Sequence, residues 1–183
     1  MDLTKGSIWQ LLRKVTIPAS TGSLFQTCYN LVDTYFAGRI SPEALAAIAK
    51  SWPIYFIAIA VAVGIGAGTT ALISNAIGAK EGRKASMYVA QSIILAIMIS
   101  IFVTLFGLNF SDELLRVMGS TEESITLTRE YLDIIFFGAI IVLVQISLNG
   151  TLNAQGDTKS YRNVLIFTFF LNIFLNPLFI FGY

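Results

Sequence analysis

The sequence predicts an all-α membrane protein, a polytopic bundle of about five transmembrane helices. Only 13% of the 183 residues are charged, about half the share typical of soluble domains. Five stretches without Asp, Glu, Lys or Arg cover 18, 29, 27, 23 and 21 residues. Each stretch reaches the roughly 17–25 residues that a helix needs to cross a bilayer core. Stretches this long and uniform are not barrel strands, so helices are the structure that satisfies their backbone in lipid.

The expected helices follow these stretches in order. Their approximate bounds are residues 15–37, 44–76, 85–108, 123–152 and 161–183. Residues 1–14 form an amphipathic segment suited to the membrane interface. In the second helix Pro53 is expected to bend the axis, and Gly64 and Gly68 have the GxxxG spacing of closely packed membrane helices.

The longest connection between helices covers residues 109–124. Residues 114–118 are expected to form a short interfacial helix within it, which Gly119 ends. Ser120 and Glu123 then have the spacing of a capping box for the fourth helix. The fifth helix is still apolar at the last residue, so we expect this chain to be one piece of a larger protein.

The basic residues predict which ends of the helices face the cytoplasm. Eight precede the first helix or lie in the 2–3 and 4–5 connections, and four lie on the opposite side: Lys5, Arg13, Lys14, Lys80, Arg83, Lys84, Lys159 and Arg162 against Arg39, Lys50, Arg116 and Arg129. Because basic residues are enriched in cytoplasmic loops, the N-terminus is expected to be cytoplasmic and the C-terminal end external, in the plasma membrane.

Composition also excludes several kinds of function. The chain has no histidine, which removes histidine metal sites and catalytic triads that need this residue. Its one cysteine, Cys28, cannot form an internal disulfide. The net charge of +1 offers no general attraction to nucleic acid. We therefore expect a protein that is not an enzyme, binds no cofactor and works in the lipid bilayer.

Asp33 is the main candidate for a functional residue, because it ends the first apolar stretch. A charged residue at the centre of a membrane helix costs about 2.5–3.5 kcal/mol by insertion scales, so it is retained where it faces a bundle interior or a hydrated cavity. There it binds a proton, a sodium ion or a cationic ligand. The alternative is a structural charge at the far interface that reaches Arg39, six positions later.

Other polar residues of the first helix lie on the same face as Asp33. Ser23, Gln26 and Asn30 precede it at spacings that put all four residues on one stripe of the helix, and Tyr29 adds a hydroxyl to this stripe one turn before Asp33. We interpret the stripe as the wall of a hydrated cavity that contacts substrate. The alternative for each residue is a hydrogen bond to a neighbouring helix.

The fourth and fifth helices carry further amides. Asn172 and Asn176 lie on one face, and Pro177 after them frees a backbone carbonyl. Amide and carboxylate oxygens are hard ligands that suit sodium, or that hold a protonated carboxyl in place. Gln145 and Asn149 share a face of the fourth helix, and their spacing leaves packing and cavity roles equally open.

Four segments, in order, resemble the multidrug and toxic compound extrusion (MATE) family. They are QTCYNLVDTYFAGRISPEALAA (26–47), GIGAGTTALISNAIGAKEGRKA (64–85), LNGTLNAQGDTKSYRN (148–163) and LNIFLNPLFIFG (171–182). The resemblance implies a twelve-helix transporter of two six-helix lobes. Residues 1–183 would then form helices one to five of the amino-terminal lobe, with the carboxy-terminal lobe missing.

The resemblance also implies roles for individual residues. Asp33 matches the helix-one acid of the amino-lobe cation site, and Asn172 matches a helix-five asparagine of that site, so these two would hold sodium if sodium is bound. Pro18 matches a helix-one proline linked to bending of that helix. Asn176 departs from the pattern, because many members of this prokaryotic branch carry a second aspartate there.

The predicted function is therefore a cation-coupled antiporter that exports small amphiphilic or cationic compounds in exchange for H⁺ or Na⁺. One alternative is a lipid-linked sugar flippase of the same superfamily, which needs basic residues inside its cavity; Arg13 and Lys14 lie only at the edge. Another is a non-transporting membrane assembly subunit. An intramembrane enzyme would need an acid pair, a histidine cluster or a Ser-Lys dyad within the spans, and the sequence has none.

Overall fold

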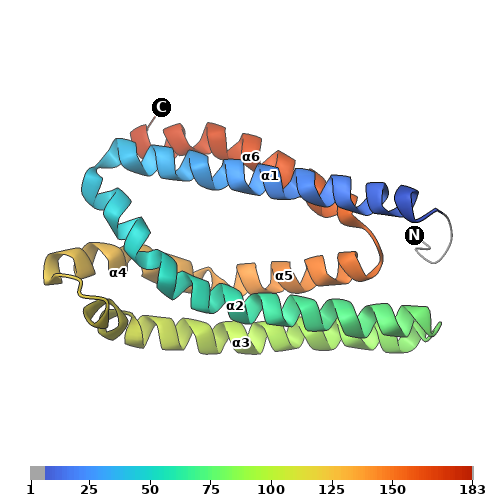
Figure 1. The fold of residues 1–183 in the computed structure, drawn as a ribbon. Coiled ribbons are helices and arrows are strands. Elements are labelled where there is room, and N and C mark those ends of the chain that lie inside the picture. Colours follow the sequence, from blue (N-terminus) through green and yellow to red (C-terminus); the bar gives the residue numbers. More distant parts are fainter. Residues whose placement is uncertain (1–6, 183) are drawn as a thin grey trace. The chain divides into compact units, whose positions relative to one another are not determined.

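The computed structural model describes residues 7–182, with every side chain in that range except those of Gln10 and Leu11. Expectations that concern residues 1–6, including Lys5, and Tyr183 lie outside the described residues. The described part is helical, with no strand, which confirms the all-α prediction. Its helices are α1 (Ile8–Ile40), α2 (Pro42–Gly78), α3 (Gly82–Val117), α4 (Glu122–Phe137), α5 (Ala139–Ala154) and α6 (Thr158–Phe181), drawn in Figure 1.

The single helix expected over residues 123–152 is wrong, because the chain breaks there. Gly138 separates α4 from α5, and the two helices are bent by 47° relative to each other. Glycine has the lowest helix propensity after proline, so a break costs least at this residue. The apolar residues continue on both sides of Gly138. The apolar pattern alone therefore predicted one long helix.

The connection between α3 and α4 is shorter than expected. Residues 114–117 belong to α3 itself rather than to a separate interfacial helix, which corrects that prediction. Gly119 follows with φ of 77°, so the helix ends there as expected. The N-cap of α4 is Thr121, without a side-chain hydrogen bond, so the capping box from Ser120 is also wrong.

Within residues 7–182, α2, α3 and α6 are each long and apolar enough to cross a membrane, and the bent α4–α5 pair meets the same test as one unit. Helix α1 does not meet it, although it is 33 residues long. The reason is its content of Ser, Thr, Gln and Asn, which lowers its hydropathy. Of the five expected membrane spans, four pass this test (α2, α3, α6 and the α4–α5 pair), and the polar helix α1 does not.

The helices group into two compact units, each described by itself. The first unit contains α1 and α6, which lie side by side and run in the same direction (Figure 1). Residues in contact differ by a nearly constant number along the chain: Phe25 meets Phe169, and Phe36 meets Phe181. Gly22 permits the approach, since a Cβ there would lie 3.2 Å from the side chain of Leu165.

Helix α6 begins at a well-formed N-cap. Asp157 accepts hydrogen bonds from the backbone N–H groups of Lys159 and Ser160, and from the Ser160 hydroxyl at 2.6 Å. The hydroxyl and the backbone N–H of Ser160 lower the pKa of the Asp157 carboxyl, because both stabilise its charged form. The end of α6 next to the AQGDTK connection is thereby fixed.

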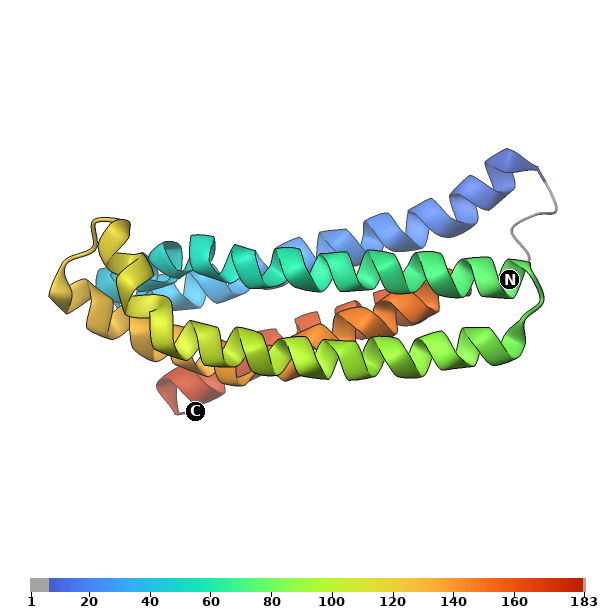
Figure 2. The same ribbon diagram turned by 90° about the horizontal axis from the view of Figure 1, so that it is seen from below.

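The second unit contains α2, α3, α4 and most of α5. Helices α2 and α3 are antiparallel neighbours, as Figures 1 and 2 both show. Side chains from all four helices form the core, among them Ile54, Ala96, Val103, Leu132 and Leu143. This buried face holds the unit together, while many large apolar side chains on the outer faces stay exposed.

Glycines bring helices close together in the second unit, but not at the positions expected. A Cβ on Gly150 of α5 would lie 2.7 Å from the carbonyl oxygen of Gly66 on α2, so the two backbones cross in direct contact there. Gly64 and Gly68 have open space where a Cβ would stand. Their prediction as packing residues is therefore wrong. The close approach belongs to Gly66, which lies between them.

Candidate functional site

The structure brings Asp33, Asn172 and Asn176 together, although 139 residues separate the first two in sequence. Asn172 Nδ2 donates to Asp33 Oδ1 at 2.6 Å, and Asn176 Nδ2 donates to the same oxygen at 3.0 Å. Asn176 Nδ2 also lies 3.1 Å from Asn172 Oδ1. The three side chains form a closed triangle of hydrogen bonds between α1 and α6.

Local sequence explains this convergence. Asn172 and Asn176 are four residues apart on α6, so they face the same neighbour one turn apart. Asp33 lies opposite them because α1 and α6 run parallel. Pro177 lies inside α6 immediately after Asn176, and its missing N–H leaves the carbonyl of Ile173 without an intrahelical partner.

Within residues 7–182, Asp33 has no basic partner. Arg39, the alternative partner, is exposed; its Nη1 lies 3.5 Å from the Tyr35 hydroxyl and its guanidinium 6.0 Å from the Tyr35 ring centre. The structural interpretation of Asp33 as half of an Arg39 ion pair therefore has no support in the geometry. Asp33 is held by two neutral amides instead.

The arrangement leaves Asp33 with one oxygen engaged and one available. Asn172 is 92% buried, so the bonded side of the carboxyl is shielded, whereas Asp33 itself is half-buried. Oδ2 has no hydrogen-bond donor among the described residues. A carboxylate oxygen with unshared lone pairs can take a proton or coordinate a cation. The triangle holds this oxygen in place for either event.

Of the remaining α1 candidates, Gln26 and Asn30 do not join the triangle, whereas Tyr29 contacts it. Gln26 and Asn30 are exposed, and neither side chain hydrogen-bonds α6 or any other described helix. Tyr29 is half-buried one turn before Asp33, and its hydroxyl interacts with the side chain of Asn172. The hydroxyls of nearby Thr27 and Thr34 donate hydrogen bonds to backbone carbonyls within α1, so these donors are satisfied inside the helix. The interhelical hydrogen bonds of the alternative interpretation are therefore not formed at Gln26 and Asn30.

Gln145 and Asn149 belong to α5 in the second unit, whereas the triangle belongs to the first. Gln145 is exposed. Asn149 is half-buried, and its Oδ1 is buried without a hydrogen-bond partner among the described residues. It precedes Gly150, where α2 and α5 are in backbone contact. A buried acceptor without a donor favours a polar role over plain packing for Asn149.

One polar cluster was not expected from sequence. Arg129 of α4 donates to Asp112 of α3 and lies 3.7 Å from Asp133, one turn later in α4. Each aspartate keeps one buried oxygen without a partner within the described part of the chain. The i,i+4 spacing of Arg129 and Asp133 could have indicated half of the cluster. The contact with Asp112 depends on how α3 packs against α4.

Comparison with known proteins identifies the family of the chain. The MatE family model matches residues 18–178, which is most of the chain and includes all three residues of the triangle. The chain belongs to the MATE family. Its relatives in this family are transporters, and with the apolar helices this makes it a multi-pass membrane protein.

Individual relatives agree with one another. The chain is 27% identical over 180 residues to a FAD transporter of Shewanella oneidensis and 28% identical to the multidrug export protein MepA of Staphylococcus aureus. It superimposes on an outward-facing multidrug resistance MATE family transporter with a TM-score of 0.89 at 32% identity. These matches cover 98% of this chain and 40% of each relative. The chain thus spans about two fifths of the length of such MATE transporters.

Proposed function

We propose that this chain supplies the ion-carrying part of a cation-coupled MATE exporter, and that Asp33 is the group that carries the ion. The observation behind the proposal is the Asp33 carboxyl, which two amides hold by one oxygen while no described basic residue neutralises it. An acid without a fixed counter-charge inside a membrane helix is costly unless it binds an exchangeable cation. Alternation between free and cation-bound carboxyl provides the coupling.

The proton is the coupling ion that the local chemistry favours. The two amides present N–H groups to Asp33, and Asn172 Oδ1 is already used by Asn176, so few oxygens remain for sodium. With Asn at position 176, the site has a single carboxylate and takes up one positive charge at a time. A single proton on Oδ2 satisfies it without further ligands.

Helix α1 transmits the change in this proposal. Pro18 is buried inside α1 and lacks the N–H that would bond the carbonyl of Lys14, which weakens the helix there. Binding of a cation at Asp33 alters the hydrogen bonds between α1 and α6. The altered contact shifts α1 between straight and bent forms about Pro18, and the cavity wall with Gln26, Tyr29 and Asn30 moves with it.

The full cycle requires more than this chain. A second lobe would complete the cavity, since the matched relatives are about two and a half times as long. The transporter would lie in the plasma membrane with a cytoplasmic N-terminus. Its substrates would be small amphiphilic or cationic compounds, as for the multidrug relatives, while the FAD transporter makes flavins a second substrate class to test.

Transport by Asp33→Asn tests the proposal in the full-length protein. The amide resembles the protonated carboxyl in shape but cannot release a proton, so we expect export of a cationic dye from cells to be lost at unchanged membrane expression. Glu130→Gln, an exposed acid-to-amide change on α4, is the matched control and should export normally. Export that persists in Asp33→Asn would refute the role of Asp33.

Proteoliposomes then identify the ion. A pH gradient without sodium should drive dye and flavin uptake by the unmodified protein, and a sodium gradient at equal pH should not. If uptake occurs only with the sodium gradient, the coupling ion is Na⁺ rather than the proton, and Asp33 is retained as its binding site.

A further inference from the structure

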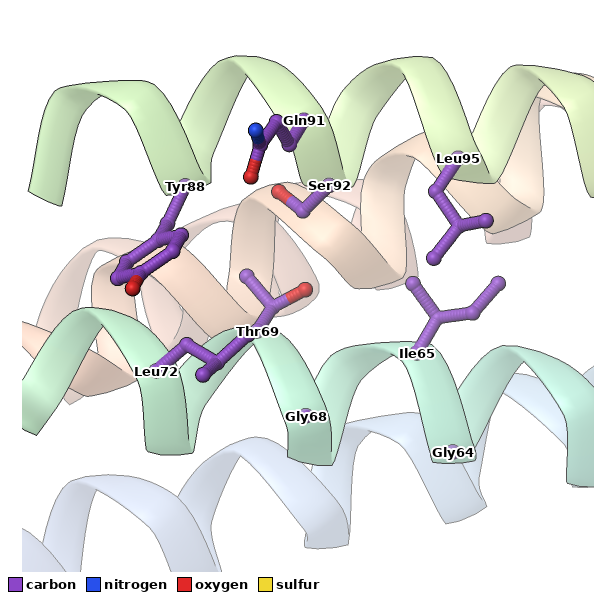
Figure 3. Close-up of a pocket in the computed structure, with 9 residues that line it drawn as sticks. All are labelled: Gly64, Ile65, Gly68, Thr69, Leu72, Tyr88, Gln91, Ser92 and Leu95. Atoms are coloured by element: carbon purple, nitrogen blue, oxygen red, sulfur yellow. The ribbon is translucent and has the colours of Figure 1, made fainter. Parts of the chain in front are cut away.

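A groove of about 380 Å³ lies between α2 and α3, in the second unit. Figure 3 shows its walls, with Gly64, Gly68 and Leu72 on α2 and Tyr88, Gln91 and Leu95 on α3. All six positions lie inside the long apolar stretches between charged residues. Where this surface faces the core of a bilayer, acyl chains rather than water surround it.

Three polar groups line the groove without a partner. Thr69 is 96% buried, and its hydroxyl is directed from α2 into the space between the helices in Figure 3. The Tyr88 hydroxyl and the Gln91 amide enter from α3. None of the three side chains makes a hydrogen bond within residues 7–182. Since unsatisfied polar groups are costly in lipid, the groove calls for a ligand that offers hydrogen-bonding atoms.

The two glycines make room for such a ligand. A Cβ at Gly64 or Gly68 would meet nothing within 4 Å, so neither glycine is needed for α2 to pack against α3. Leu72 and Leu95 flank them with exposed apolar surface. The result is a narrow apolar channel with polar atoms on its floor and side, which suits an acyl chain and the ester groups at its head.

The groove leads toward a basic end. Lys84, Tyr88, Gln91 and Leu95 follow one another at spacings of 4, 3 and 4 residues, so they lie on one face of α3. At a rise of about 1.5 Å per residue, Lys84 lies about 10 Å beyond Gln91 along the helix. Its ammonium pairs with Glu81 at 2.9 Å, an exposed contact that binds weakly.

Other features at this end also favour an anion. Lys80 and Arg83 make no ion pair within the described part of the chain and are exposed. Residues 79–84 contain three basic residues and one acidic residue, Glu81. Helix α3 begins at Gly82, and its first N–H groups and helix dipole attract negative charge.

We propose that this groove binds an anionic phospholipid from the leaflet on the side of residues 79–84. The phosphate lies against Lys84 and the start of α3, the glycerol esters accept hydrogen bonds from Tyr88 and Gln91, and one acyl chain passes Gly68 and Gly64. The inference requires that α2 and α3 cross a bilayer, and it does not depend on the transport proposal.

Native mass spectrometry of the full-length protein in detergent tests the proposal. Phosphatidylglycerol and phosphatidylethanolamine of equal chain length are titrated in parallel. We expect the unmodified protein to retain one phosphatidylglycerol in preference to phosphatidylethanolamine. A photoactivatable phosphatidylglycerol should crosslink within residues 64–95 of the unmodified protein.

Variants locate the site. Gly68→Leu adds a side chain at a position where a Cβ meets nothing within 4 Å, so it should occupy the groove and remove the retained lipid. Lys84→Gln should weaken phosphatidylglycerol binding about fivefold, the worth of one basic residue at an anionic surface. Lys159→Gln, in the connection before α6, is the matched control and should change nothing.

Three results would overturn the proposal. If the protein retains both lipids equally, the groove does not recognise the negative charge of the headgroup. Lipid that stays bound in Gly68→Leu places the lipid elsewhere. Crosslinks confined to other segments show that something else, such as a helix outside this chain, covers the groove.

Discussion

At the scale of single residues, Asn172 is the side chain on which the geometry of Asp33 depends most. It is buried, and it makes the shorter of the two hydrogen bonds to the carboxyl, at 2.6 Å. Asn176 reaches the same oxygen at 3.0 Å and is more exposed. Asn172 therefore positions Asp33, and Asn176 supports it.

Asn172→Ala should reduce export by roughly 10- to 100-fold, because a hydrogen bond to a charged group contributes about 1.5–3 kcal/mol. Membrane expression should be unchanged. The measurement is the initial rate of dye efflux at equal protein level, with Asn163→Ala on the exposed part of α6 as control.

A double mutant separates positioning from a general effect of Asn172 on folding. Because Asp33→Asn is expected to abolish export, the cycle is read from the midpoint of thermal unfolding in detergent. If Asn172 acts only through its hydrogen bond to Asp33, adding Asn172→Ala to Asp33→Ala should lower this midpoint little further, whereas an additive drop would show that Asn172 has a role of its own.

At the scale of helices, the contact between α2 and α5 depends on two glycines. A methyl group at Gly150 would lie 2.7 Å from the Gly66 carbonyl oxygen and 3.2 Å from the Thr70 hydroxyl, which also donates to the Gly150 carbonyl at 3.0 Å. Backbone atoms on the facing helix cannot turn aside. The two helices would have to separate.

Gly150→Ala should therefore destabilise the protein by about 1–3 kcal/mol, the usual cost of overpacking. Gly64→Ala is the matched change on α2, where the added methyl meets nothing, and it should stabilise slightly through its higher helix propensity. Thermal unfolding in detergent measures both. Equal midpoints for the two variants would contradict the crossing described here.

The same glycines show why some elements could be predicted from sequence and others could not. The apolar stretches located α2, α3 and α6 because length and composition decide whether a helix can span a membrane. Which of Gly64, Gly66 and Gly68 faces another helix depends on the rotation of α2, which spacing alone does not determine. The break at Gly138 has the same origin, since glycine also occurs inside unbroken helices such as α2.

The candidate site could likewise be predicted from sequence only in part. Asp33, Asn172 and Asn176 could be selected because each polar group in an apolar helix is costly and therefore noticeable. Their meeting could not be derived from spacing, because it depends on the parallel packing of α1 and α6. The Arg129 cluster and the unpartnered Thr69 were missed for a related reason: charged residues one turn apart on a helix and hydroxyls in helices are too common to indicate a site.

At the scale of the whole molecule, contacts within each unit determine how often the chain crosses the membrane. Thr104 of α3 donates to the Phe136 carbonyl at the end of α4, and Ser92 of α3 meets Ser147 of α5. In both contacts a later residue of α4–α5 meets an earlier residue of α3, as in one antiparallel pair. Helices α4 and α5 together therefore run once along α3 despite their bend. This single crossing agrees with the parallel directions of α1 and α6, because two helices that cross a membrane in the same direction have an odd number of crossings between them.

This count makes a prediction about the two sides of the membrane. Ala79, next to the basic residues between α2 and α3, should face the cytoplasm, and Thr121, between α3 and α4, should face the outside. Single cysteines are introduced by Ala79→Cys and Thr121→Cys after Cys28→Ser and the replacement of any cysteine that the full-length protein carries outside residues 1–183. In intact cells a membrane-impermeant maleimide should label Thr121→Cys at once and Ala79→Cys only after permeabilisation. Labelling of both in intact cells would mean that α3 does not cross, and the reverse pattern would place the N-terminus outside.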